Sequence, residues 1–298
     1  MLPQVFKDKE LQTAYEKDGY VIVPFFTANE VEQLLEVYEK LHKKTEKGFF
    51  SSVHSSNTAY KDQVHQLLNK FGQKVINTYL RDYDILISNF ITKKPGPDSL
   101  VPLHQDWTFV DETQYASINV WCPLVDVDRK NGAISLLKAG HRIGFTIRGT
   151  LVPSAFNEVD NMRYENLTYL PMKAGEVLLY DHRLVHASPP NESEQVRVAA
   201  VFSTIPKKAQ AIHYFQNPKS EKLEKYATNP QFYIDYTYGD NEIPSDTALL
   251  ENVNNYNYPE FSNKQIEPLL EKVADKKEVS MLQKMKNWLK NSFATSDT

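Results

Sequence analysis

The sequence contains a single cysteine, Cys122, among 298 residues. One thiol excludes an internal disulfide and fits a reducing compartment. No apolar run approaches the roughly 18 residues that a bilayer-spanning helix needs, and the first residues lack the charged-then-apolar order of a signal peptide. We therefore expect a soluble cytoplasmic protein with no membrane partner.

A strong charge bias is absent as well. The formal net charge is −4, whereas nucleic-acid-binding proteins usually carry a strongly basic face. The sequence also has no internal repeat, and its 41% hydrophobic content is enough for a sizeable core. These absences leave a globular protein with a small-molecule partner and no nucleic acid. We expect residues 1–298 to form one domain, and the oligomeric state stays open.

What the sequence does contain is a block of helical patterns followed by many short strands. Apolar residues at helical spacing predict helices over 11–15, 31–41 and 59–80, the second introduced by a capping box from Thr27 to Glu30. Alternating or β-branched runs predict strands at 19–24, 84–92, 115–123, 133–137, 176–180 and 196–204. This order predicts a mainly β fold, an antiparallel sandwich or barrel with the N-terminal helices packed on one sheet.

Several segments lack a clear period. Residues 48–56 are serine-rich and read as a mobile loop. Residues 139–170 form a long irregular connection, which is typical of a functional lid or a disordered loop, and we expect its arginines to be solvated: Arg142, Arg148 and Arg163. Residues 206–262 are rich in tyrosine, which we interpret as packing rather than as a wall for a substrate. An apolar stripe over 281–289 predicts a helix docked on the domain, in preference to a membrane-surface or partner helix.

The stretch around His104 and Asp106 carries the chemistry. Side chains two residues apart on a strand point to the same face, so both can reach one metal ion while Gln105 turns away. This supplies two ligands of the two-histidine, one-carboxylate triad of non-haem iron enzymes. The pair alone is weak evidence for a metal site, because such motifs occur by chance.

The missing ligand should be a histidine on a later strand. Two candidates follow the apolar run 176–180, namely His182 and His186. Eleven residues beyond His186 stands Arg197, which shares a strand face with small and apolar neighbours. A buried, unpaired arginine is costly, and a carboxylate bound by both ends of its fork would satisfy it.

Together these residues resemble the phytanoyl-CoA dioxygenase family. The resemblance covers about residues 10–205, and residues 206–298 remain a C-terminal extension without an assigned role. It implies a double-stranded β-helix (jelly-roll, cupin-like) fold and an Fe(II)- and 2-oxoglutarate-dependent dioxygenase that hydroxylates a small organic metabolite with O2, releasing succinate and CO2. The motifs that carry it are His104-Gln105-Asp106, His186, Arg197, and the segments 18–24, 121–126 and 129–133.

Residue by residue, the resemblance implies that His104, Asp106 and His186 bind the iron. Arg197 would grip the distal carboxylate of 2-oxoglutarate, with Ser188 and Trp121 beside the co-substrate. Halogenating relatives replace the carboxylate ligand by a small residue, so Asp106 favours hydroxylation or a related oxidation such as desaturation.

Other interpretations of the same residues remain. A cupin-like metalloenzyme would bind iron but not 2-oxoglutarate, and a non-catalytic binding protein could use the same fold. We expect His182 to be structural or to support a ligand, and His141 and His213 to be structural. Cys122 is expected to be a buried small hydrophobe.

Overall fold

The computed structural model describes residues 4–42, 48–144, 146–159, 167–239 and 241–266. The helix predicted over 281–289 and the side chain of Arg163 lie outside these residues. Within the described part of the chain, no helix is long and apolar enough to cross a membrane.

The N-terminal helices form as the sequence predicts. The capping box is present, because the Thr27 side chain accepts from the backbone of Glu30 while the Glu30 carboxylate accepts from the backbone of Thr27. All three helices present apolar side chains to one sheet, where they form the largest apolar cluster of the protein. The helices are α1 (Lys9–Asp18), α2 (Ala28–Leu41) and α3 (Thr58–Tyr79).

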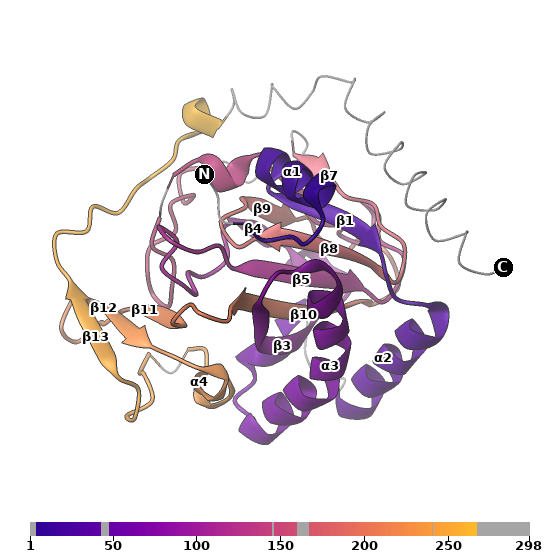
Figure 1. Ribbon diagram of the computed structural model, residues 1–298, viewed down its shortest axis with the longest axis horizontal. Coiled ribbons are helices and arrows are strands. Elements are labelled where there is room, and N and C mark those ends of the chain that lie inside the picture. The colour runs from indigo at the N-terminus through magenta and orange to yellow at the C-terminus, as the bar shows by residue number, and fades with distance from the viewer. Residues whose placement is uncertain (1–3, 43–47, 145, 160–166, 240, 267–298) are drawn as a thin grey trace.

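The major sheet lies beneath these helices (Figure 1). It has six strands, and every neighbouring pair is antiparallel. Their spatial order differs from their order in the chain, as a jelly roll requires. Across the sheet they run β1 (Tyr20–Pro24), β8 (Glu176–Asp181), β5 (Ile118–Pro123), β10 (Arg197–Pro206), β3 (Tyr83–Lys93) and β2 (Phe49–Ser51).

The minor sheet has four antiparallel strands and faces the major one. Between the two sheets lies a second apolar cluster, which includes Trp121, Leu136 and Val201. The alternation of β5 explains this layering, because Val120 and Cys122 pack toward the helices while Trp121 packs between the sheets. Two facing antiparallel sheets confirm the predicted jelly roll. The minor sheet runs β4 (Val101–His104), β9 (His186–Ser188), β6 (Ser135–Leu136) and β7 (Thr168–Tyr169).

Residues 206–262 are more regular than their sequence predicts. They hold a three-stranded antiparallel sheet and a short helix. The helix packs through Phe232 and Tyr233 in a cluster with Ile87 of β3 and Phe109. In residues 206–262, tyrosine supplies much of the buried apolar surface. The alternation of aliphatic residues that usually indicates strands is therefore weak in this region. The elements are β11 (Ile212–Gln216), β12 (Leu223–Ala227), α4 (Pro230–Asp235) and β13 (Leu249–Val253).

The serine-rich segment 48–56 is not the free loop that we predicted. It forms the edge strand β2 and the short 3-10 helix η1 (Ser52–His54). The Ser51 hydroxyl accepts from the Asn89 side chain at 2.8 Å, and the Ser52 hydroxyl accepts from the backbone of Phe90 at 2.9 Å. Hydroxyls that seemed to mark flexibility therefore tie this segment to β3.

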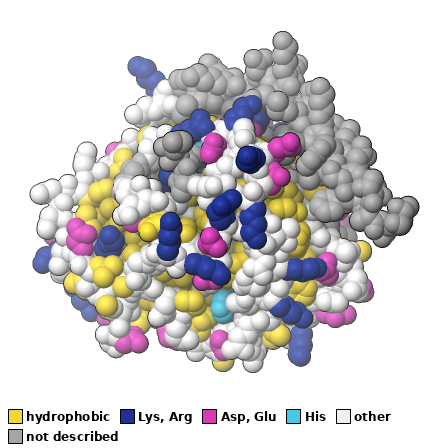
Figure 2. Space-filling model, in the orientation of Figure 1, with side chains coloured by type: hydrophobic (Ala, Val, Ile, Leu, Met, Phe, Trp, Pro, Cys, Tyr) yellow, Lys and Arg dark blue, Asp and Glu magenta, His cyan; other side chains and the backbone are white. Residues whose placement is uncertain are grey.

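Charged side chains of both signs are mixed over the face shown in Figure 2. Lysine and arginine stand among aspartate and glutamate, with apolar surface visible between them (Figure 2). This mixture agrees with the small net charge of −4.

Candidate metal and co-substrate site

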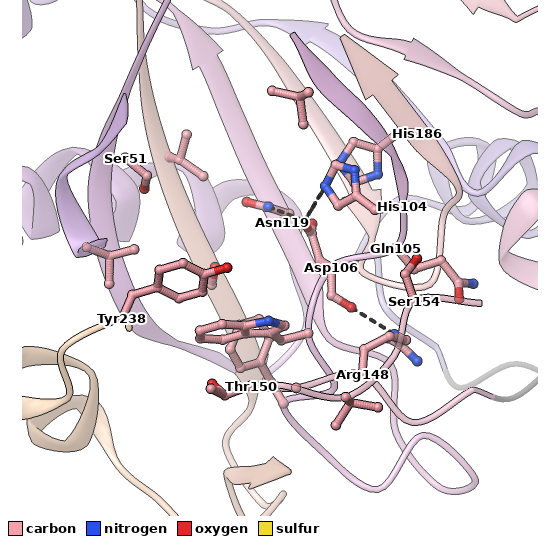
Figure 3. A pocket seen from close by; sticks show the side chains of 18 of the residues that line it. Ser51, His104, Gln105, Asp106, Asn119, Arg148, Thr150, Ser154, His186 and Tyr238 are labelled. Atoms are coloured by element: carbon pink, nitrogen blue, oxygen red, sulfur yellow. Dashed lines mark hydrogen bonds and ion pairs between the residues drawn. The ribbon is translucent and has the colours of Figure 1, made fainter. Parts of the chain in front are cut away.

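The structure brings His104, Asp106 and His186 together at the minor sheet. His104 and His186 are cross-strand partners on β4 and β9, and one ligand atom from each of the three residues lies within 4.8 Å of the others. The Asp106 Oδ1 atom is 3.7 Å from His104 Nε2 and 3.8 Å from His186 Nε2. Figure 3 shows the two imidazoles directed toward the carboxylate. One ion could contact all three side chains.

Both histidines present the nitrogen that a metal needs. The Nδ1 atom of His104 donates to the Pro102 carbonyl at 2.7 Å, and that of His186 donates to the Leu184 carbonyl at 2.8 Å. A carbonyl only accepts, so each Nδ1 carries the proton and each Nε2 keeps its lone pair free. Such partners orient metal-binding histidines.

Asp106 lies just past the end of β4, not inside a strand as we predicted, since the strand stops at His104. Three other contacts fix it. Its backbone N–H donates to the His182 carbonyl at 3.0 Å, its own carbonyl accepts from Arg148 Nε at 2.8 Å, and its Oδ2 atom accepts from Asn119 at 3.0 Å. The carboxylate therefore has a set direction although its backbone has left the sheet.

The electrostatics keep this group ready for a cation. Burial alone would raise the pKa of Asp106, but the neighbouring His186, His182 and His104 and the Asn119 hydrogen bond lower it to about 2. Burial, together with the nearby His186, lowers the pKa of His104 to about 4. At neutral pH the aspartate is ionised and His104 is neutral, which are the forms that bind metal.

Arg197 lines the same cavity. It is 2% exposed, its Nη1 atom donates to the Gly132 carbonyl at 2.7 Å, and its Nε–H has no hydrogen-bond acceptor. Among the described residues no carboxylate pairs with it. Burial lowers the pKa of Arg197 to about 9, so the guanidinium remains charged at pH 7. Its environment fits an anion supplied from outside the chain.

The two other predicted co-substrate residues surround Arg197. Its guanidinium carbon lies 5.3 Å from the centre of the Trp121 ring. The Ser188 hydroxyl donates to the Gly132 carbonyl at 2.7 Å, the same acceptor that Arg197 uses. Both residues line the cavity.

Sequence reasoning missed Lys93, which faces Arg197 across the β3–β10 pair. Its side chain is fully buried, and Nζ donates to the Ser188 carbonyl at 2.9 Å and to the Pro189 carbonyl at 2.5 Å. Burial and the charge of Arg197 lower its pKa to about 6. The sequence did not indicate a role for this lysine at the end of an apolar strand. Its position opposite Arg197 depends on the register between β3 and β10, which the sequence pattern does not define.

Asn119 and Arg148 are further residues that the sequence analysis missed. Asn119 could have been suspected, as it is a polar residue on the inward face of an apolar strand. Arg148 was predicted to be a solvated charge, and this is wrong. Its side chain is 11% exposed and forms a bidentate pair with the Glu112 carboxylate at 2.7 and 2.6 Å. Arg142 is exposed, as expected, and bonds to the Glu16 carbonyl.

The cavity that contains these residues has a volume of about 590 Å³, within the usual range for small-molecule sites. Tyrosines from the C-terminal region reach its wall, namely Tyr233, Tyr238 and Tyr258. The prediction that these tyrosines only pack is therefore wrong in part, because Tyr238 is 54% exposed and faces the cavity (Figure 3).

We call His104, Asp106 and His186 the metal-ligand group. The other residues considered in the sequence analysis do not join this group, namely His182, His141, His213 and Cys122. His182 is fully buried and contributes its carbonyl to Asp106, so it supports that residue without joining the group. His141 and His213 are buried, and His213 Nε2 lies 3.0 Å from the Thr150 hydroxyl. Cys122 is free and fully buried.

A jelly roll with two histidines and one carboxylate facing its interior defines the class of metal-binding cupin-like proteins. Comparison with known families gives the next step. The family model for phytanoyl-CoA dioxygenase (PhyH) matches residues 15–199, and the chain belongs to this family. Tyr233, Tyr238 and Tyr258 lie beyond the matched region.

Individual relatives are more distant. The chain is 25% identical to phytanoyl-CoA dioxygenase domain-containing protein 1 of Danio rerio, over 63% of this chain and 60% of that protein. It is 26% identical to a Dictyostelium discoideum homologue of that protein, over 47% of this chain and 50% of the relative. The matches thus span about half to three-fifths of these relatives. HygX of Streptomyces hygroscopicus, solved with nickel, 2-oxoglutarate and hygromycin B, is similar with a TM-score of 0.46 and 15% identity, over 67% of this chain and 88% of HygX.

Proposed function

We propose that this chain is an Fe(II)- and 2-oxoglutarate-dependent dioxygenase that hydroxylates a C–H bond of a small organic metabolite and releases succinate and CO2. One observation carries the proposal. The free Nε2 atoms of His104 and His186 and the Asp106 carboxylate converge in the cavity where Arg197 is buried without a carboxylate partner among the described residues. The predicted metal ligands and an unmatched cation thus share one cavity.

The donor set fits iron. Two imidazoles and one carboxylate on one side of an ion are the facial triad of Fe(II) oxygenases, and they leave other coordination positions open. Bound there, Fe(II) would supply the activation of O2 coupled to oxidative decarboxylation of the co-substrate. The chain itself contributes orientation, through the carbonyls that fix both histidine rings and through Asn119, which holds the Asp106 carboxylate.

The part of the cavity around Arg197 fits the distal carboxylate of 2-oxoglutarate. Arg197 has a free Nε–H, and a carboxylate held by its fork would compensate the cost of burying the charge. In this proposal Trp121 covers the guanidinium and Ser188 limits the space beside it. Lys93 lies beside Arg197 across the β3–β10 pair but does not line the cavity. Because its pKa is lowered to about 6, Lys93 is largely neutral at pH 7, and Arg197 carries the charge.

The proposal extends to the whole chain. The C-terminal region supplies three tyrosines to the cavity wall, one from α4 and two from the segments that follow α4 and β13, so we infer that residues 206–266 work together with the jelly roll as one catalytic unit. The free, buried Cys122 supports a reducing compartment such as the cytoplasm.

The experiment that tests this function is spectroscopic. Fe(II) and then 2-oxoglutarate are added anaerobically to the purified full chain, and the visible spectrum is followed for the weak metal-to-ligand charge-transfer band of chelated 2-oxoglutarate. We expect the band in the unaltered chain and its loss in His186→Ala. Metal binding without a band would favour a cupin-like metalloenzyme that does not use 2-oxoglutarate. Absence of metal binding would favour a non-catalytic binding protein.

A further inference from the structure

Tyr238 is a half-exposed aromatic residue held in place at the cavity. Its ring centroid is 4.5 Å from that of His54, with planes 21° apart, and 6.2 Å from that of Trp107, with planes 27° apart. These are offset-stacked arrangements, so the three rings form a nearly parallel set, which we call the aromatic platform. Tyr238 nevertheless keeps 54% of its surface exposed, and its hydroxyl end points into the cavity (Figure 3).

The platform is connected rigidly to the metal-ligand group. Trp107 directly follows Asp106 in the chain, and its ring is supported edge-on by His213 at 5.0 Å and by Tyr236 at 6.4 Å. A molecule stacked on the platform would therefore lie at a fixed distance from Asp106. Such positioning selects which C–H bond faces the metal.

Each charged side chain that lines the cavity already has a partner or an assigned role. Apart from histidines, the described residues that line it include three charged ones, Asp106, Arg148 and Arg197. Arg148 pairs with Glu112, while Asp106 and Arg197 are assigned to the metal and the co-substrate. Burial, and then the charge of Lys61, lower the pKa of His54 to about 4. Lys61 does not line the cavity, and its Nζ atom donates to the Tyr236 carbonyl at 2.8 Å. Among the described residues that line the cavity, no charged side chain is therefore left to pair with a charged substrate.

The cavity that holds the platform also has neutral hydroxyls and amides in its lining. They include Ser51, Asn89, Thr150 and Ser154, set among apolar residues. A substrate with hydroxyl or carbonyl groups on a flat skeleton would find both stacking surface and hydrogen-bond partners in this cavity, whereas a phosphate-bearing substrate would find no unassigned cation among the described residues that line it.

We propose that the aromatic platform of His54, Trp107 and Tyr238 binds an uncharged substrate with a planar ring system, stacked beside the metal-ligand group. This proposal rests on the proposed function, since it names the substrate class of the same site. Tyr238 lies outside the region that matches the family model, residues 15–199. The platform therefore combines a ring next to a metal ligand with a ring from the C-terminal region.

The test measures binding of simple probes to the full chain by equilibrium dialysis, without metal or 2-oxoglutarate. The probes are 2-naphthol, which is planar and neutral, 1-decanol, which is a neutral chain, and 2-naphthalenesulfonate, which is planar and anionic. Two variants remove the flat surface, Tyr238→Ala and Tyr238→Leu, of which the second keeps apolar bulk. Tyr238→Phe keeps the ring, and Tyr115→Ala removes a tyrosine outside the cavity.

We expect 2-naphthol to bind more tightly than the other two probes. Loss of one stacking partner should weaken 2-naphthol binding about five- to ten-fold in both Tyr238→Ala and Tyr238→Leu, with changes within about two-fold in Tyr238→Phe and Tyr115→Ala. If Tyr238→Ala and Tyr238→Leu bind 2-naphthol as tightly as the unaltered chain does, the platform is overturned. Preference for 1-decanol or for the sulfonate would overturn the substrate class.

Failure of this proposal and failure of the proposed function can be told apart. Probe binding is measured without metal, whereas the charge-transfer band is measured without a probe. Tyr238-dependent 2-naphthol binding in a chain that gives no band would retain the platform and reject the dioxygenase assignment. A band together with Tyr238-independent binding would do the reverse.

Discussion

Arg148 joins a buried carboxylate to the backbone of a predicted metal ligand. Its Nε atom donates to the Asp106 carbonyl at 2.8 Å, while both terminal nitrogens donate to the Glu112 carboxylate. The Glu112 side chain is 1% exposed, so the pair is shielded from solvent. Arg148 is thus placed to act as a positioning residue, which would affect metal binding through Asp106.

Replacing Arg148 by Lys should weaken Fe(II) binding about ten-fold, because a lysine keeps the charge near Glu112 but cannot hold two acceptors in a rigid fork. Anaerobic metal titration of the full chain measures this. Arg142→Lys, on an exposed arginine of the same connection, is the matched control and should bind Fe(II) as the unaltered chain does. Equal Fe(II) affinity in the two variants would rule out the positioning role.

Replacing Arg197 by Ala should reduce 2-oxoglutarate affinity, since the distal carboxylate would lose its charged partner. A hydrogen bond to a charged group contributes about 1.5–3 kcal/mol, so Kd should rise about ten- to hundred-fold. Titration of the charge-transfer band measures Kd. Lys93→Met removes a neighbouring buried amine that does not line the cavity and should have a clearly smaller effect. Similar losses in both variants would show that contact with Arg197 is not what holds the co-substrate.

Stability should fall in acid because of His213. This residue is fully buried, and burial lowers its pKa from 6.5 to about 3. Between pH 6.5 and 3, His213 therefore binds a proton in the unfolded chain but stays neutral in the folded chain. The stability present above pH 6.5 is lost as the pH falls, by up to about 1.4 kcal/mol per pH unit for this group.

Urea unfolding at pH 7.5 and pH 5.0 measures this loss. His213→Gln cannot titrate but can still bond to Thr150, so the difference between its stabilities at the two pH values should be smaller than that of the unaltered chain. Parallel pH profiles for the two proteins would show that other groups cause the acid sensitivity, such as His141, whose pKa burial lowers to about 4.

Gly149 permits a close approach between the cavity wall and the C-terminal sheet. A Cβ atom at this position would lie only 2.0 Å from the Tyr214 carbonyl oxygen of β11. The neighbouring residue Thr150 forms a bridge with Phe215. Gly149→Ala should therefore force the two segments apart and cost about 1–3 kcal/mol of unfolding free energy. Thermal unfolding measures it, with Ser154→Ala as a control on the same wall. An unchanged Tm for Gly149→Ala would contradict this contact.

Local patterns predicted an antiparallel sandwich or barrel and the pairing of His104 with Asp106, because alternation in β5 and the spacing of these two residues are properties of neighbouring residues. The jelly roll and the choice of His186 over His182 were implied by the resemblance to the family. The partners of these residues could not be predicted in the same way. Arg148 reaches Asp106 from an irregular connection, and Lys93 meets Arg197 only through strand register. Contacts of this kind depend on how segments distant in sequence pack together. The periodicity of apolar residues within one segment carries no information about this packing.

The opposition of His104 and His186 on adjacent strands has a consequence for the protein as a whole. An ion held by both would join two segments that are far apart in sequence, and closing a long loop restricts the unfolded chain. This protein has one cysteine, which is buried, and cannot form an internal disulfide. Such an ion would act as a cross-link in place of a disulfide, and a chelator could remove it while added metal could restore it. Metal supply would then set the lifetime of the folded chain as well as its chemistry.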